Sequence, residues 1–177
     1  MNKELKKICS CNPVRPLFLS FADPLKQECA LRYNCSYDQL YNNKDLFTRK
    51  KLQEVDIEFR EKYGKMVYVN AMEMNIHLHV DRSDINVIII PDVRFPGEMK
   101  FIQDNGGKVY RVIAKQRTHD KLFIDCKGDE NEMKLRSNHI SETSLDKENF
   151  DGYIKNDGGN EPEKQCIQLI KQLISNY

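Results

Sequence analysis

Residues 85–113 decide the fold, and they read INVIIIPDVRFPGEMKFIQDNGGKVYRVI. Residues 85–90 are apolar almost throughout, which predicts a strand covered on both faces, as in a parallel sheet. Residues 96–104 predict a helix, and residues 105–107 (Asn-Gly-Gly) end it through a left-handed cap. Residues 109–113 predict the next strand. A strand, a helix and a second strand in this order indicate a parallel α/β sheet with a right-handed crossover.

Further elements are expected before this segment. Residues 17–21 predict a short strand, and Asp23-Pro24 then starts a helix, because Asp caps free amides and Pro is tolerated at the first helical position. Residues 48–63 predict a charged helix with Thr48 as its cap. Residues 66–80 nearly alternate between apolar and polar, which favours a strand, whereas their length favours a helix. A short helix is also predicted over residues 3–10.

After this segment, residues 115–137 are strongly charged and predict a mobile segment. Residues 153–154 predict a brief final strand, and residues 163–174 carry the apolar stripe of a helix. Alternating strands and helices indicate an α/β fold, in which ligands bind at the carboxyl ends of the strands. Two polar segments follow predicted strands, namely residues 20–23 and 92–94.

Length and composition limit the classes of function. The 177 residues suit a single domain, and 28 basic against 27 acidic residues leave a net charge of +1. A protein that binds nucleic-acid polymers usually has a basic surplus. The longest apolar run is far shorter than the ~18 residues that cross a membrane. The N-terminus lacks the apolar core of a signal peptide, so we expect a cytoplasmic protein whose six cysteines are reduced thiols.

Three residues near the predicted strand ends are candidates for phosphate chemistry. Asp92 can orient Mg²⁺ or a metal-bound water, although many α/β proteins end a strand in Asp. The Arg94 guanidinium can bind a phosphate through two N–H groups, or it can form a structural pair with Asp92. Lys26, in the first turn of a helix, can add a charge to an anion site, or it can simply be solvated.

Other charged residues are less specific. Arg49 and Arg60 lie on the predicted charged helix, where most such side chains face solvent. Arg117 lies in the charged segment after a strand, a composition that solvated surfaces share with the lids of phosphotransferases. His77 and His79 could bind a metal, but packed or surface histidines account for them better, so no metal site is predicted.

Several motifs together carry a resemblance to a known family. In order they are SFADPLK (20–26), RKKLQ (49–53), IIPDVRFPGE (89–98), NGGKV (105–109), SETSL (141–145) and NDGG (156–159). This series resembles the deoxynucleoside monophosphate kinases of phages and large DNA viruses, and more distantly the animal phosphomevalonate kinases. The resemblance covers residues 17–175, and it is most specific around residues 92–96.

The resemblance implies a three-layer P-loop-kinase-like parallel sheet with helices on both faces. It implies transfer of the γ-phosphoryl group of ATP, with Mg²⁺, to a deoxynucleoside monophosphate in the host cytoplasm. It makes residues 66–80 a helix and residues 115–137 a lid. It also assigns site residues: Asp23, Lys26, Arg49 and Arg60 to the acceptor, Asp92 and Arg94 to the reacting phosphates, Arg117 to the lid and Asn156 to the ATP base.

One departure from the family concerns its first strand and its G-x-x-x-x-G-K loop, which hold the ATP phosphates. These parts need roughly 24 residues, whereas 16 residues precede Leu17 and the first glycine is Gly64. We therefore expect either a sequence that starts downstream of the true start, or a protein without this phosphate cradle. The second case predicts a degenerate kinase that binds a nucleotide or a protein without turnover. It would also leave pairing edges exposed, which a homodimer could cover.

Overall fold

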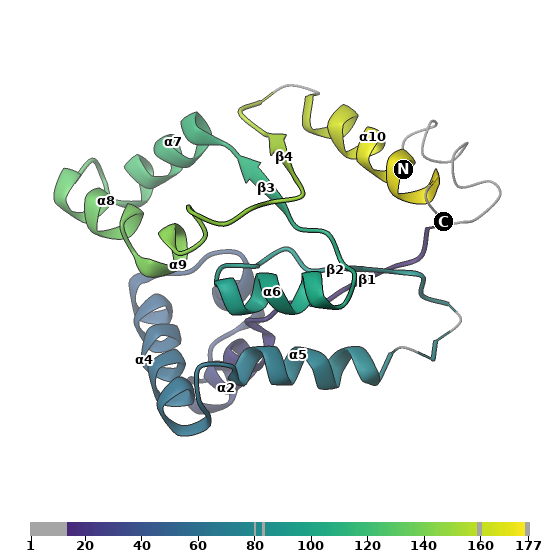
Figure 1. The fold of residues 1–177 in the computed structure, drawn as a ribbon. Coiled ribbons are helices and arrows are strands. Elements are labelled where there is room, and N and C mark those ends of the chain that lie inside the picture. Colours follow the sequence, from purple (N-terminus) through teal and green to yellow (C-terminus); the bar gives the residue numbers. More distant parts are fainter. Residues whose placement is uncertain (1–13, 80, 83, 159–160, 176–177) are drawn as a thin grey trace. The chain divides into compact units, whose positions relative to one another are not determined.

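The computed structural model describes residues 14–79, 81–82, 84–158 and 161–175, so the helix predicted over residues 3–10 lies outside it (Figure 1). The chain is mixed α/β, and its strands form parallel pairs. Its residues group into two compact units, one comprising Val14–Val93 and the other continuing from Arg94. Each unit is described by itself. In the described residues no helix is long and apolar enough to cross a membrane.

The first unit, Val14–Val93, contains a two-stranded parallel sheet and a group of helices (Figure 1). One cluster of its core consists of four buried side chains, Cys29, Cys35, Leu40 and Val55. Leu25, Leu52 and Phe59 are among the partly buried residues packed against them. The elements are β1 (Pro16–Phe18), α2 (Asp23–Tyr33), α3 (Tyr37–Tyr41), α4 (Leu46–Tyr63), α5 (Val67–His77) and β2 (Val87–Ile89).

The second unit contains the other parallel pair, β3 and β4 (Figure 1). Helix α10 packs beside β4 and is fastened to it by Gln165, whose side-chain amide accepts from Lys155 N at 3.0 Å and donates to Lys155 O at 3.1 Å. Buried Met99, Val109 and Ile167 belong to this unit. The elements are α6 (Pro96–Asp104), β3 (Tyr110–Ile113), α7 (Lys115–Asp125), α8 (Glu130–Ser137), α9 (Ile140–Thr143), β4 (Gly152–Lys155) and α10 (Glu161–Ser175).

The strand–helix–strand order predicted over residues 85–113 is confirmed, but the two strands belong to different ladders. β2 pairs with β1, from Pro16 opposite Val87 to Phe18 opposite Ile89, and β3 pairs with β4. The prediction that β2 is covered on both faces is wrong, because its three residues are each 37–38% exposed. β1 is the only strand that pairs with β2 in the described part of the chain, so the apolar run lacks the neighbours of an interior strand.

Helix α6 confirms its predicted bounds, and its end shows the expected cap. Asn105 N donates to Phe101 O at 3.3 Å, and Gly106 has a φ of 76°, which a residue without a Cβ adopts readily. Helix α4 differs at its start. Asp45, not Thr48, is its N-cap, and the Asp45 carboxylate accepts from Thr48 N at 2.7 Å. Asp and Thr both cap helices, and the two apolar residues between them, Leu46 and Phe47, made the earlier start hard to recognise from the sequence.

Two further segments are helical. Residues 66–80 contain α5, so helical length overrides the near alternation of their side chains. Residues 115–137 contain α7 and α8, and their mobility stays a prediction. In α8, Arg136 and Glu132 form an ion pair one helical turn apart at 2.8 Å, and such a pair supports a helix.

Asp151, directly before β4, binds the two residues that precede β3. Its carboxylate accepts from Val109 N at 2.9 Å and from Lys108 Nζ at 3.1 Å. Burial alone would raise the pKa of Asp151, but the Val109 amide and the Lys108 ammonium more than offset it and lower the pKa. A lowered folded-state pKa adds stability above the unfolded-state pKa of about 3.9, and this stability is lost as the pH falls through the folded-state pKa.

We therefore expect Asp151→Asn to reduce stability at pH 6 and to have a much smaller effect below about pH 3. Urea denaturation of both proteins between pH 2 and 7 measures the difference. The control is Asp104→Asn, which alters an exposed carboxylate paired with Lys100. An Asp151→Asn effect that stays constant across this range would contradict the assigned role of the charge.

Candidate functional site

The carboxyl ends of β1 and β2 meet at the start of α2. Asp92, which follows β2, reaches the loop that follows β1: its Oδ2 accepts from Ser20 Oγ at 2.6 Å and from Ala22 N at 3.0 Å. Its Oδ1 accepts from Phe21 N at 3.0 Å. Asp92 therefore holds amides at the N-terminus of α2, a position where a negative charge is favourable. Asp92 is thus held by this loop and not by the structural pair with Arg94 that was the alternative prediction.

Lys26 lies in the first turn of α2 and is largely enclosed, with a side chain 14% exposed. Among the described residues, its ammonium has only distant oxygen partners, Ser20 Oγ at 3.5 Å and Asp23 Oδ1 at 3.7 Å. It also lies 4.0 Å from the centre of the Tyr41 ring. An ammonium has three donors, so this one retains capacity for an anion.

Tyr41 lies beside both Lys26 and Asp23. Its hydroxyl donates to Asp23 Oδ1 at 3.0 Å. Burial, followed by the bond to Asp23, raises the pKa of Tyr41 to about 12. The ring also stacks on Tyr37, with centroids 4.4 Å apart and planes 14° apart, and Tyr37 is 70% exposed. We call Ser20, Asp23, Lys26, Tyr41 and Asp92 the β1–β2 cluster.

Sequence reasoning missed Tyr41, although a local signal was present. Ser36 and Gln39 form a capping box: Gln39 N donates to Ser36 Oγ at 3.3 Å, and Ser36 N donates to Gln39 Oε1 at 2.9 Å. The S-x-x-Q spacing of this motif predicts the helix start and hence α3, which carries Tyr37 and Tyr41.

The two arginines predicted to bind the acceptor make contacts along α4. Arg49 Nε donates to Lys44 O at 3.3 Å. Arg60 binds Asp56 at 2.9 Å and Lys65 O at 3.2 Å, and its guanidinium lies 4.9 Å from the centre of the Tyr68 ring. The structure therefore brings Asp23, Lys26 and Asp92 together and gives Arg49 and Arg60 local partners.

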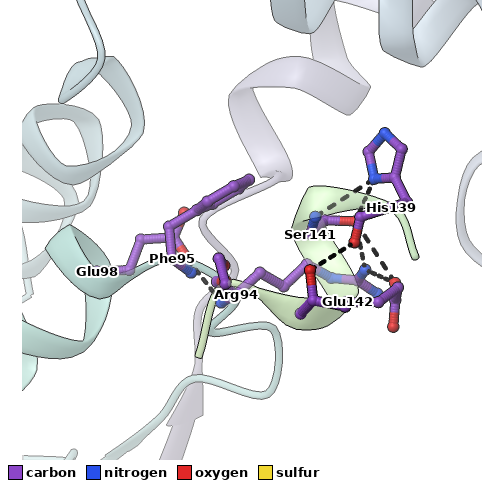
Figure 2. Close-up of polar contacts among 8 residues, drawn as sticks. Arg94, Phe95, Glu98, His139, Ser141 and Glu142 are labelled. Atoms are coloured by element: carbon purple, nitrogen blue, oxygen red, sulfur yellow. Dashed lines mark hydrogen bonds and ion pairs between the residues drawn. The ribbon is translucent and has the colours of Figure 1, made fainter. Parts of the chain in front are cut away.

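The remaining predicted residues belong to the second unit. Arg117 on α7 and Asn156 after β4 are brought together, with Arg117 Nη1 donating to Asn156 Oδ1 at 3.2 Å. Asn156 is held by its own amide, which donates to Ile113 O at 2.7 Å. Arg94 binds Glu142 and lies 3.4 Å from Ser141 Oγ (Figure 2).

The described side chains do not offer a dedicated metal site. Among them, no group of three or more His, Cys, Asp or Glu residues could hold a metal ion. His77 and His79 are therefore not part of such a group. Both oxygens of Asp92 also accept hydrogen bonds. The described cysteines, Cys29, Cys35, Cys126 and Cys166, are free thiols, as expected, and burial raises the pKa of Cys29 to about 11.

Comparison of the chain with models of protein families and with curated proteins gave no match.

Proposed function

We propose that this protein is a phosphotransferase of the deoxynucleoside monophosphate kinase type, and that residues 14–93 bind the acceptor nucleotide. The observation that carries the proposal is the enclosed Lys26 ammonium beside an aromatic pair. A nucleoside monophosphate combines a phosphate with a flat base. Lys26 supplies a partner for the phosphate, and the exposed face of Tyr37 supplies a surface on which a base can stack.

The other parts of the proposal come from the family resemblance. The two parallel strand pairs would belong to one three-layer sheet, and Mg·ATP would be the phosphoryl donor in the cytoplasm. Because the described side chains do not fit a dedicated Mg²⁺ site, Mg²⁺ would enter with the ATP phosphates, which are among its usual ligands. The proposed roles are phosphate contact for Asp92, Arg94 and Arg117, acceptor contact for Asp23, Arg49 and Arg60, and base contact for Asn156.

A second candidate is a kinase-like protein that binds the nucleotide without turnover. The observation that favours it is that both carboxylate oxygens of Asp92 are already occupied, because they accept three hydrogen bonds from the β1–α2 loop and leave the carboxylate less available for phosphoryl transfer. A carboxylate used in this way fixes the binding loop whether or not phosphoryl transfer follows. Measurements of binding and turnover separate the two candidates.

The experiment is calorimetric titration of the full chain with dTMP, dGMP, dCMP and Mg·ATP in turn. We expect at least one deoxynucleoside monophosphate to bind. Lys26→Met, which keeps the length of the side chain, should weaken that binding by about tenfold, because it removes a hydrogen bond to a charged group. Production of the diphosphate from Mg·ATP would favour the kinase, and binding without product would favour the second candidate.

Lys50→Met is the matched control, because Lys50 is an exposed lysine of α4 in the same unit. It should bind the nucleotide as the unaltered chain does. If no deoxynucleoside monophosphate binds, or if the two lysine variants are weakened equally, Lys26 is not part of a phosphate site and the proposal fails.

A further inference from the structure

Arg94 is held at its backbone by helix α6. The Glu98 carboxylate accepts from Arg94 N at 2.8 Å and from Phe95 N at 3.1 Å. Glu98 is only 5% exposed, so these bonds lie in a sheltered position. The same carboxylate thus fixes the chain at Arg94 and the start of α6, as Figure 2 shows.

The side chain of Arg94 is held by α9, about fifty residues further along the chain. The Arg94 guanidinium forms an ion pair with Glu142 through Nη1, which also lies 3.4 Å from Ser141 Oγ. The Ser144 hydroxyl donates to Arg94 O. Figure 2 shows the Arg94 side chain extending to Glu142 and Ser141. The guanidinium and the carbonyl of Arg94 are therefore held by α9 and its C-cap, Ser144.

Helix α9 is in turn ordered by His139, its N-cap. His139 Nδ1 accepts from Ser141 N at 3.3 Å and lies 2.9 Å from Ser141 Oγ. Ser141 and Glu142 follow directly in the helix. The cap fixes the backbone from which both side chains reach Arg94.

Within the described residues, the Arg94 side chain makes its hydrogen bonds through Nη1 alone, so the donors of Nε and Nη2 stay unpaired. The side chain is also 51% exposed. A guanidinium fixed on one side by a carboxylate and open on the other is arranged to bind an anion with its remaining N–H groups.

We infer that Glu142 is a positioning residue, which holds the Arg94 guanidinium in one orientation so that Nε and Nη2 can bind a phosphate group. The phosphate ligand in this inference rests on the proposed function. The orientation of Arg94 by Glu142 rests on the contacts alone. A free arginine side chain loses rotamer entropy when it is fixed. Glu142 fixes it before the anion binds. A carboxylate has the same relation to the phosphate-binding lysine of protein kinases.

The opposite role, in which Glu142 competes with the phosphate for Arg94, gives the opposite result on mutation. Removal of a competitor strengthens anion binding, whereas removal of a positioning group weakens it. The sign of the change in affinity therefore decides between the two roles.

The first measurement concerns the ligand-free full chain. The heteronuclear ¹⁵N NOE of Arg94 Nε, assigned by its loss in Arg94→Lys, reports the order of the side chain. We expect an ordered signal that becomes mobile in Glu142→Gln. The control is Asp146→Asn, which removes the partner of Arg111 in the same unit and should leave the Arg94 signal unchanged. An Arg94 signal that is mobile in the unaltered chain, or equally ordered in Glu142→Gln, would overturn the inference.

The second measurement is calorimetric titration with inorganic pyrophosphate and with whichever of dTMP, dGMP and dCMP binds in the titration described above. Glu142→Gln should weaken the affinity by roughly fivefold, the scale of one partly exposed charged contact. In the Arg94→Ala background the same substitution should have no effect. Stronger binding by Glu142→Gln overturns the inference in favour of competition. If the unaltered chain binds neither probe, the proposed function fails, and the NOE alone decides whether Glu142 orders Arg94.

Discussion

Asp92→Ala is expected to lower the free energy of unfolding by about 3 kcal/mol, because three donors lose a charged acceptor together. The donors are the Ser20 hydroxyl and the amides of Phe21 and Ala22, all within 3.0 Å of the carboxylate. Phe21 is 2% exposed, so water has poor access to this loop once the carboxylate is removed. Each such unsatisfied group costs about 1–3 kcal/mol.

Urea denaturation followed by circular dichroism measures this loss. Asp81→Ala is the matched control, because Asp81 is an exposed aspartate of the same unit, and its loss should change stability by less than about 0.5 kcal/mol. Asp92→Asn, which keeps one acceptor oxygen, should fall between the two. A loss below about 1 kcal/mol in Asp92→Ala would show that the loop is held by other contacts.

Leu40→Ala is expected to lower the free energy of unfolding by about 3 kcal/mol, because it leaves a cavity in the core of the first unit. Leu40 is 2% exposed and packs with Cys29, Cys35 and Val55. Its helix, α3, has only five residues, so its position depends on this contact more than on its own hydrogen bonds.

Leu31→Ala is the control for this prediction, since the same atoms are removed from a side chain that is 82% exposed. We expect a change within about 0.5 kcal/mol. The difference between the two variants, measured by urea denaturation, isolates the burial of Leu40. Equal effects of the two substitutions would show that Leu40 does not lie in a packed core.

The elements that sequence reasoning predicted well depend on neighbouring residues. Helix α6 begins at Pro96 and ends before Asn105-Gly106, and both signals act within one helical turn. Helix α2 also begins at Asp23-Pro24, as predicted from the proline, but its N-cap is Ala22 and no side-chain cap hydrogen bond forms, so the predicted capping by Asp23 is wrong. Local signals were weaker for α7 and α8, whose high charge is also typical of solvated segments, and the Arg136–Glu132 pair of α8 was not recognised.

The pairing partners of the strands could not be predicted from residues near each strand in the sequence. The apolar run at residues 85–90 predicted a strand, but composition could not show that β1 is its one described partner or that its residues stay more than one third exposed. Exposure depends on which other elements cover a strand, and those elements come from distant parts of the sequence.

The candidate site divides in the same way. Asp23, Lys26, Asp92 and Arg94 were found because each follows a predicted strand or begins a helix. Their partners were not found, because Asp92 binds residues 70–72 positions away and Arg94 binds Glu142 48 positions away. Tyr41 lies on a helix that was recognisable from its capping box but was not predicted.

The sequence by itself determined the α/β class, the bounds of α6 and the chemical types available near the strand ends, because helix caps and hydrophobic periodicity act over a few residues. Only the tertiary structure decided that the Asp92 carboxylate fixes the loop before α2, that Lys26 lies against Tyr41, and that Glu142 holds Arg94. These contacts form between elements that are remote in the chain, and their geometry follows from how strands pair and helices pack.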